Sequence, residues 1–126
     1  MTKYDHYKNL AFELDGRVMT VFLNRPEKLN VFTLEMELEV CQFLHDSALD
    51  KEFDVVILTG KGRAFSAGGD IEGWMLPNVQ DPNNVPAVPT KRTVFALLDY
   101  PKPIIAKLNG HAVGLGAAPG GWTWQL

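Results

Sequence analysis

Two segments of this sequence repeat one device: a short apolar run, then a glycine-rich turn, then the start of an expected helix. The first reads DVVILTGKGRAFSAGGDIEGWM over residues 54–75, and the second reads KPIIAKLNGHAVGLGAAPGG over residues 102–121. Short continuous apolar runs are typical of strands that are buried on both faces of a parallel sheet. Because such strands alternate with helices along the chain, the repeated device predicts an α/β fold.

Other patterns extend this fold in both directions. The runs LAFEL (residues 10–14) and VMTVFLN (residues 18–24) flank an Asp-Gly turn signal and together predict a β-hairpin. Residues 33–50 and residues 91–100 have the apolar spacing of helices. A length of 126 residues matches the usual size of one domain, so we expect a single α/β domain.

The expected first helix has a recognisable start and a predicted buried side. Thr33 is a good N-cap, and acidic residues follow it in the first turn, where the helix dipole favours anions. Residues at helical spacing form the expected buried stripe: Leu34, Leu38, Cys41, Leu44 and Ala48. Cys41 is therefore interpreted as a core residue, since a reactive thiol needs an electropositive and partly exposed site.

Composition argues against several classes of function. The net charge of −3 and the scattered Lys and Arg residues provide no basic patch of the kind that binds nucleic acid. The single cysteine has no disulfide partner, and no Cys/His cluster has zinc spacing, so no metal site is expected. No apolar run approaches the ~18 residues of a membrane span, and the first ten residues lack the apolar core of a signal peptide. We therefore expect a cytoplasmic protein that binds neither membranes nor nucleic acid.

The glycine-rich turns are compatible with several kinds of chemistry. Ser66 is a candidate nucleophile, but its window lacks the first glycine of the Gly-x-Ser-x-Gly elbow. Neither turn is a P-loop, and GLGAAPG places its third glycine one position late for a dinucleotide fingerprint. Two turns facing each other from neighbouring strands would instead supply two backbone N–H donors to one oxygen, which is an oxyanion hole. Tight turns and close packing alone would also account for the glycines.

Three stretches of the chain resemble one family. FSAGGDI, with the preceding ILTGKGRA, resembles the first signature of the enoyl-CoA hydratase/isomerase family, the crotonases, and PKPIIAKLNGHAVGLGA resembles the second. LNRPEKLNVFTLEMELEV is similar to the family's N-terminal strand, CoA-contacting turn and first helix. The resemblance covers about residues 10–117 and implies a crotonase-like ββα spiral, truncated to its N-terminal half. It implies an acyl-CoA thioester as ligand and no separate cofactor, because coenzyme A enters as part of the substrate.

The resemblance also implies roles for individual residues. The backbone N–H groups of Gly69 and Leu115 match the two donors of the family's oxyanion hole, which stabilises the enolate of the thioester. The residues that match the CoA-contacting segments are Arg25, Lys28, Ser66, Ala67, Gly68, Asp70 and Ile71. Among these, Arg25 and Lys28 match a basic turn near the CoA phosphates, and Asp70 also suits a simple helix N-cap.

The sequence departs from the family pattern near its end. Ala118 stands where family hydratases have the first of two acid/base glutamates, and the second would fall beyond Leu126. Residues 118–126, APGGWTWQL, form an atypical tail, which suggests that the reading frame or gene model leaves the family near Ala117. Two hypotheses stay open: a hydratase, lyase or isomerase of fatty acid metabolism, or an inactive remnant that binds acyl-CoA weakly or only associates with relatives. The resemblance implies trimers or hexamers for complete members.

Overall fold

The computed structural model describes residues 2–69, 89–113 and 124–125. Its elements follow in this order: β1 (Leu10–Asp15), β2 (Val18–Leu23), the 3-10 helix η1 (Pro26–Lys28), α1 (Leu34–Ser47), β3 (Val55–Gly60), β4 (Ala64–Ser66), α3 (Pro89–Asp99), β5 (Ile104–Ala106), β6 (His111–Ala112) and β7 (Trp124–Gln125). The predicted α/β class is therefore confirmed, as are the hairpin, both helices and the two central strands, β3 and β5. These two strands are not buried on both faces as predicted, because half-buried residues alternate with buried ones along them. The tail, in which no element was expected, contributes the short strand β7.

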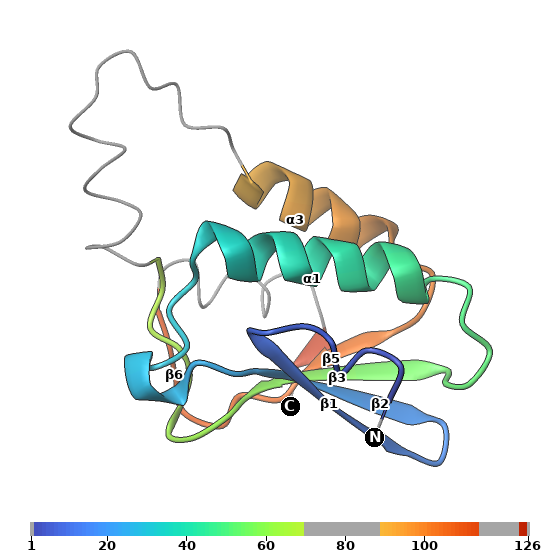
Figure 1. The fold of residues 1–126 in the computed structure, drawn as a ribbon, viewed down its shortest axis with the longest axis horizontal. Helices are drawn as coiled ribbons and strands as arrows, with labels where there is room; N and C mark the ends of the chain where they lie inside the picture. The colour runs from blue at the N-terminus through green and yellow to red at the C-terminus, as the bar shows by residue number, and fades with distance from the viewer. Residues whose placement is uncertain (1, 70–88, 114–123, 126) are drawn as a thin grey trace.

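The larger sheet is mixed and has the strand order β1-β2-β3-β5-β7. The hairpin pairs β1 with β2 antiparallel, with Leu10 opposite Leu23, and every later pair in this sheet is parallel. In Figure 1, α1 and α3 lie side by side over the same face of the sheet. Parallel neighbours require a crossover connection, which α1 provides between β2 and β3 and α3 provides between β3 and β5.

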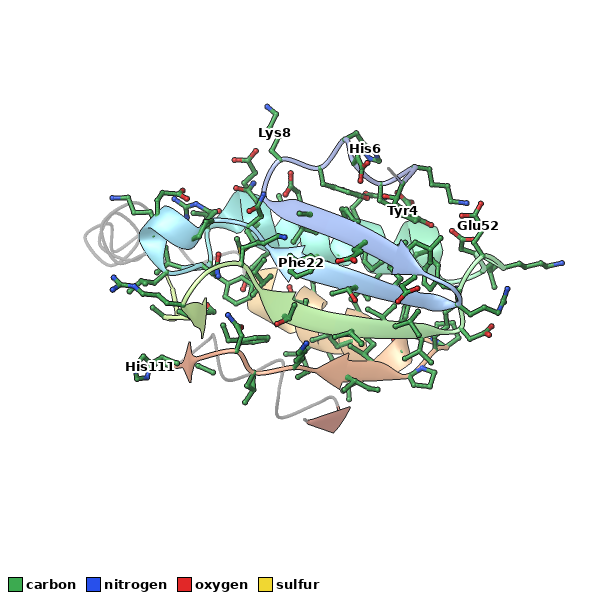
Figure 2. The ribbon with its side chains drawn as sticks, turned by 90° about the horizontal axis from the view of Figure 1, so that it is seen from below. Tyr4, His6, Lys8, Phe22, Glu52 and His111 are labelled. Carbon is green, nitrogen blue, oxygen red and sulfur yellow. The ribbon has the colours of Figure 1, made fainter. Side chains whose placement is uncertain are left out.

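The core lies between the sheet and this helical layer. In β2, Met19, Val21 and Leu23 are buried, whereas the residues between them are half-buried, which is the period-2 pattern of a strand with one covered face. Phe22 points from the opposite face, where Figure 2 shows it on the side turned away from the helices. The Lys61 ammonium group lies 3.9 Å from the centroid of its ring. A cationic side chain therefore partly covers this aromatic surface.

The predicted buried stripe of α1 is wrong for most of its members. Leu34 and Leu38 are each 42% exposed, Cys41 and Ala48 are half-buried, and only Leu44 of the stripe is buried. The face that packs on the sheet instead carries Met36, Val40, Phe43, Leu44 and Ser47. Both sets have helical spacing, but the second contains larger side chains and so removes more apolar surface from water.

The N-cap of α1 is as predicted. The Thr33 side chain accepts a hydrogen bond from the Met36 N–H at 3.1 Å, with Thr33 itself in an extended conformation. We expect Thr33→Ala to lower the free energy of unfolding by ~1 kcal/mol, because one helical N–H loses its acceptor. Thr33→Ser keeps the hydroxyl and should leave the denaturant midpoint almost unchanged. Equal losses in the two variants would show that the cap contributes nothing.

The N-terminal segment is held to the far end of α1 by a buried carboxylate. The Tyr4 hydroxyl donates to Asp50 Oδ2 at 2.5 Å, and Lys3 Nζ lies 2.9 Å from the same oxygen. Burial raises the pKa of Asp50, but hydrogen bonds from Tyr4, the Glu52 N–H and Lys3 outweigh it and hold the pKa at about 2. The charged form of Asp50 is therefore the one that the folded protein stabilises.

This depressed pKa makes stability depend on pH in the acid range. The contribution of Asp50 is complete above the ordinary value of 3.8 and is lost as pH falls through about 2. The ionised Asp50 carboxylate therefore adds about 2 kcal/mol to the free energy of unfolding at neutral pH, because each unit of pKa difference corresponds to about 1.4 kcal/mol. Unfolding measured between about pH 5 and pH 2 should therefore lose less free energy in Asp50→Asn than in the wild type. Parallel acid profiles would contradict this assignment.

Candidate functional site

Loops from three parallel strands meet at one edge of the sheet. They follow the carboxyl ends of β2, β3 and β5, and in Figure 1 they lie together beside β6. The Lys61 N–H donates to Leu23 O at 2.9 Å, and the Lys107 N–H donates to Leu58 O at 2.8 Å, so backbone bonds join adjacent loops and strands. In α/β sheets, this is the edge at which ligands bind.

The two glycine-rich segments run side by side at this edge. β4 pairs with β6 in parallel, with Ala64 opposite His111, and the Val113 N–H donates to Ser66 O at 3.0 Å. The sequence analysis predicted facing turns here but missed these short strands. Leu115, Asp70 and Ile71 lie outside the described residues, so the structure places Gly69 but not its expected partner donor.

The peptide unit between Gly68 and Gly69 is turned over relative to the strand that precedes it. Ser66 O accepts from β6, and the Ala67 N–H donates to Leu29 O on the opposite side at 2.9 Å. Two peptides further on, a regular strand would repeat this orientation. Instead, Gly68 O accepts from the Phe32 N–H at 2.7 Å, on the side of Leu29. Gly68 permits this reversal because its φ of +107° is open to glycine and unfavourable for other residues.

The reversal decides where the Gly69 N–H points. In a trans peptide the C=O and the following N–H point in opposite directions, and no cis peptide occurs in the described chain. Since Gly68 O faces Phe32, the Gly69 N–H faces away from Phe32. The amide predicted as an oxyanion donor therefore lies on the side of the segment opposite to the bond between Phe32 and Gly68.

Ser66 has a structural role in this arrangement. Its side chain is wholly buried, and its hydroxyl donates to Asn30 O at 2.7 Å. The same oxygen accepts from the Gly68 N–H at 3.3 Å. A hydroxyl with both its proton and a lone pair engaged in a closed interior is poorly placed for nucleophilic attack. Ala67 also uses its N–H within the fold, so both residues help to shape the segment.

Asn30 connects the segments at this edge, and the sequence analysis missed it. Its side chain is wholly buried, and its Oδ1 accepts from the Arg25 N–H at 2.7 Å. Its Nδ2 donates to Lys61 O and to Ala64 O, each at 2.9 Å. The signal that could have identified it is LN at the end of the η1 turn, since asparagine tolerates a left-handed backbone. Asn30 has a φ of +54°.

A second asparagine braces the same loop from the other side. Asn109 Oδ1 accepts from the Gly60 N–H at 3.1 Å, and its Nδ2 donates to Gly62 O at 2.9 Å and to Ala64 O at 3.2 Å. The backbones approach so closely here that a Cβ on Gly110 would lie 2.0 Å from Arg63 O. Only glycine fits at such a contact.

The predicted CoA-contacting cations lie on the neighbouring turn. Lys28 is exposed at the end of η1, and Arg25 is half-buried, with its guanidinium donating to Val31 O at 3.2 Å. The Asn30 N–H donates to Arg25 O at 2.9 Å, which closes the turn. Both cations therefore sit on a backbone that is bonded to the strand carrying Ser66 and Gly68.

The other candidate groups give no sign of chemistry. Within residues 2–69, 89–113 and 124–125, no group of three or more His, Cys, Asp or Glu side chains is placed to hold a metal ion. Cys41 Sγ lies 3.3 Å from Thr93 Oγ1, between α1 and α3. His111 is exposed and points away from the protein in Figure 2.

No helix in the described part of the chain has the length and apolar character of a membrane span.

Comparison with known proteins identifies relatives of this chain. The family model described as enoyl-CoA hydratase/isomerase matches residues 13–119. The chain is 37% identical over 106 residues to 1,2-epoxyphenylacetyl-CoA isomerase of Escherichia coli K12, covering 79% of this chain and 39% of that protein. The solved enoyl-CoA hydratase of Mycobacterium marinum is 39% identical with a TM-score of 0.78, covering 92% of this chain and 55% of that one.

A more distant structure supports the fold alone. The enoyl-CoA hydratase of Shewanella pealeana matches with a TM-score of 0.87 at 24% identity, covering 98% of this chain and 49% of that one. The chain spans between 28% and 43% of the length of the curated relatives considered. The described residues therefore correspond to one part of a longer architecture.

Proposed function

The chain belongs to the enoyl-CoA hydratase/isomerase family, and from this premise we propose that it binds an acyl-CoA thioester and stabilises the enolate form of its acyl group. One observation carries the proposal. The peptide between Gly68 and Gly69 is turned over, so that the Gly69 N–H points away from Phe32, whose N–H is bonded to Gly68 O. A backbone N–H held in that way is the kind of donor that an oxyanion requires.

The reaction chemistry makes such a donor useful. When a proton leaves the carbon next to a thioester carbonyl, negative charge develops on the carbonyl oxygen. A fixed N–H stabilises this charge more than it stabilises the neutral carbonyl, so it lowers the barrier rather than only tightening binding. Removal of one such donor costs ~3–4 kcal/mol in known enzymes. We propose Gly69 as one donor and Leu115 as the other.

The remainder of the ligand is proposed to lie over the η1 turn. Coenzyme A carries phosphates at the end remote from the thioester, and Lys28 and Arg25 offer positive charge on the loop next to Gly68. Exposed cations attract phosphate from a distance and are screened by salt. We therefore propose that Lys28 strengthens binding chiefly at low ionic strength, while the neighbouring segment 66–69 orients the acyl end.

The test uses two ligands that differ by one oxygen. Butyryl-CoA has the thioester carbonyl, whereas S-butyl-CoA is a thioether with the same chain length and no carbonyl oxygen. Calorimetry on the wild-type chain should show binding of both, with butyryl-CoA bound about tenfold more tightly, the value of one hydrogen bond to a polarised oxygen. Equal affinities would contradict the oxyanion contact, and no binding of either ligand would overturn the proposal.

A second candidate function is binding without turnover. It is favoured by Ala118, which stands where the resemblance implies an acid/base glutamate. Positioned acid–base groups contribute about 10²–10⁴-fold to rate, so their loss need not prevent binding. An absorbance assay with crotonyl-CoA separates the two candidates. Loss of the enoyl absorbance supports an enzyme, and tight binding with no absorbance change supports the binder.

A further inference from the structure

Asn30 occupies a position that joins the two parts of the proposed site. Its side chain is wholly buried, although a buried amide is costly unless its donors and acceptor are all engaged. The Asn30 side chain meets that condition by accepting one hydrogen bond and donating two. Its backbone carbonyl accepts another from Ser66. Only asparagine and glutamine carry a side-chain amide with an acceptor and two donor hydrogens, and asparagine is the shorter of the two.

The first set of these bonds holds the cationic turn. Asn30 Oδ1 accepts from the Arg25 N–H at 2.7 Å, and the Asn30 N–H donates to Arg25 O at 2.9 Å. Two bonds between the same pair of residues close the loop that contains η1. The backbone that carries Arg25 and Lys28 is therefore fixed by Asn30 in addition to the bonds of its own short helix, which has only three residues.

The second set holds the strand that leads to the oxyanion donor. Asn30 Nδ2 donates to Ala64 O at the start of β4, and Asn30 O accepts from Ser66 Oγ at its end. Ser66 Oγ in turn accepts from the Gly68 N–H. Gly68, whose carbonyl group is part of the peptide that presents the Gly69 N–H, is thus two hydrogen bonds away from Asn30.

We propose that Asn30 is a positioning residue that sets the separation between the cationic turn and the Gly69 amide. This inference rests on the proposed function, because the separation matters only for a ligand with phosphates at one end and a thioester at the other. Such a ligand gains from both contacts at once only if the two are held at the right spacing. A displacement of ~1 Å at a reacting centre can cost about a hundredfold in rate.

Asn30→Asp is the direct test. It keeps the acceptor for the Arg25 N–H but replaces the donor to Lys61 O and Ala64 O with a second oxygen. We expect the variant to lose the roughly tenfold preference for butyryl-CoA over S-butyl-CoA. A variant that folds and keeps the wild-type preference would overturn the inference.

A pair of serine variants covers the case in which Asn30→Asp fails to fold. Ser66 and Ser47 are both wholly buried, and each makes one hydrogen bond of 2.7 Å, to Asn30 O and to the Tyr100 hydroxyl respectively. Ser47 lies at the last position of α1, at the opposite end of the helix from the site. Ser66→Ala should reduce the preference for butyryl-CoA while Ser47→Ala retains it. Equal effects from both would mean that only stability is involved.

Hydrogen exchange gives a readout that needs no ligand. The Gly68 amide should exchange about tenfold faster in Ser66→Ala, which removes its acceptor. It should also exchange faster than in the wild type in Asn30→Asp, because loss of the Nδ2 bonds to Lys61 O and Ala64 O loosens the segment that carries Ser66. In Ser47→Ala it should keep its wild-type rate relative to global unfolding. Unchanged Gly68 exchange in both site variants overturns the positioning role. Absence of CoA binding with altered exchange instead overturns the proposed function alone.

Discussion

The Gly68→Ala variant is expected to lose the preference for a thioester over a thioether and to unfold more easily. Alanine is strained at a φ of +107°, and strain of this kind costs ~1–3 kcal/mol. The backbone can relieve it by turning the 68–69 peptide back into the strand orientation. That movement breaks the bond from the Phe32 N–H to Gly68 O and directs the Gly69 N–H toward Phe32. Calorimetry with butyryl-CoA and S-butyl-CoA measures the first effect, and denaturant unfolding measures the second.

Gly16→Ala is the matched control for this experiment. Gly16 also has a positive φ, +58°, and a Cβ built there meets nothing within 4 Å. It lies in the turn between β1 and β2, at the opposite end of the sheet from Gly68. Its substitution should therefore cost stability through strain alone and leave the ligand preference intact. A Gly68→Ala protein that binds butyryl-CoA as the wild type does would show that the reversed peptide is not the donor site.

The Gly110→Ala variant should show the largest loss of stability. The new Cβ would lie 2.0 Å from Arg63 O and 3.0 Å from the Arg63 carbonyl carbon, so the two backbones must separate. Overpacking typically costs ~1–3 kcal/mol, and an overlap with backbone, which cannot rotate away, belongs at or above the top of that range. β4 and β6 would then lose their pairing, and with it the alignment of the two glycine-rich segments.

This effect is measured by the denaturant midpoint and by thioester binding together. Lys107→Ala serves as a control, because the Lys107 side chain is exposed and its backbone bond to Leu58 O does not depend on it. The control should have a wild-type midpoint. If Gly110→Ala also unfolds at the wild-type midpoint, the close approach between residues 63 and 110 is absent in solution.

Local signals in the sequence were enough to predict the main helices and strands and their order. The Asp-Gly turn predicted the hairpin because it supplies a positive φ at Gly16, and Thr33 predicted the start of α1 because its hydroxyl can cap a free N–H. The continuous apolar run in β3 predicted a central strand, and β3 does lie between β2 and β5. Each of these features depends on neighbours within a few residues, which is why composition and spacing reveal them.

The parts that depend on distant contacts were not predictable. α1 has apolar residues at helical spacing on two sides, and only the surrounding sheet decides that Met36 rather than Leu34 is buried. Asn30 was not singled out from the sequence, because its partners Lys61 and Ala64 lie more than thirty positions away. Ser66 drew attention as a hydroxyl beside glycines, yet its partner Asn30 O is equally remote in sequence.

The short loop before β4 has a consequence for how its sequence can vary. Ala64 O receives a hydrogen bond from Asn30 on one side and from Asn109 on the other, and the carbonyls of Lys61 and Gly62 are held in the same way. These hydrogen bonds involve backbone carbonyls and not the exposed side chains of Lys61 and Arg63. Because the Lys61 side chain also covers the Phe22 ring, the loop should accept nearly any residue at position 63 in particular, but it should not tolerate the insertion or deletion of even one residue. Evolution or engineering must therefore preserve the length of this loop rather than the identities of its exposed residues.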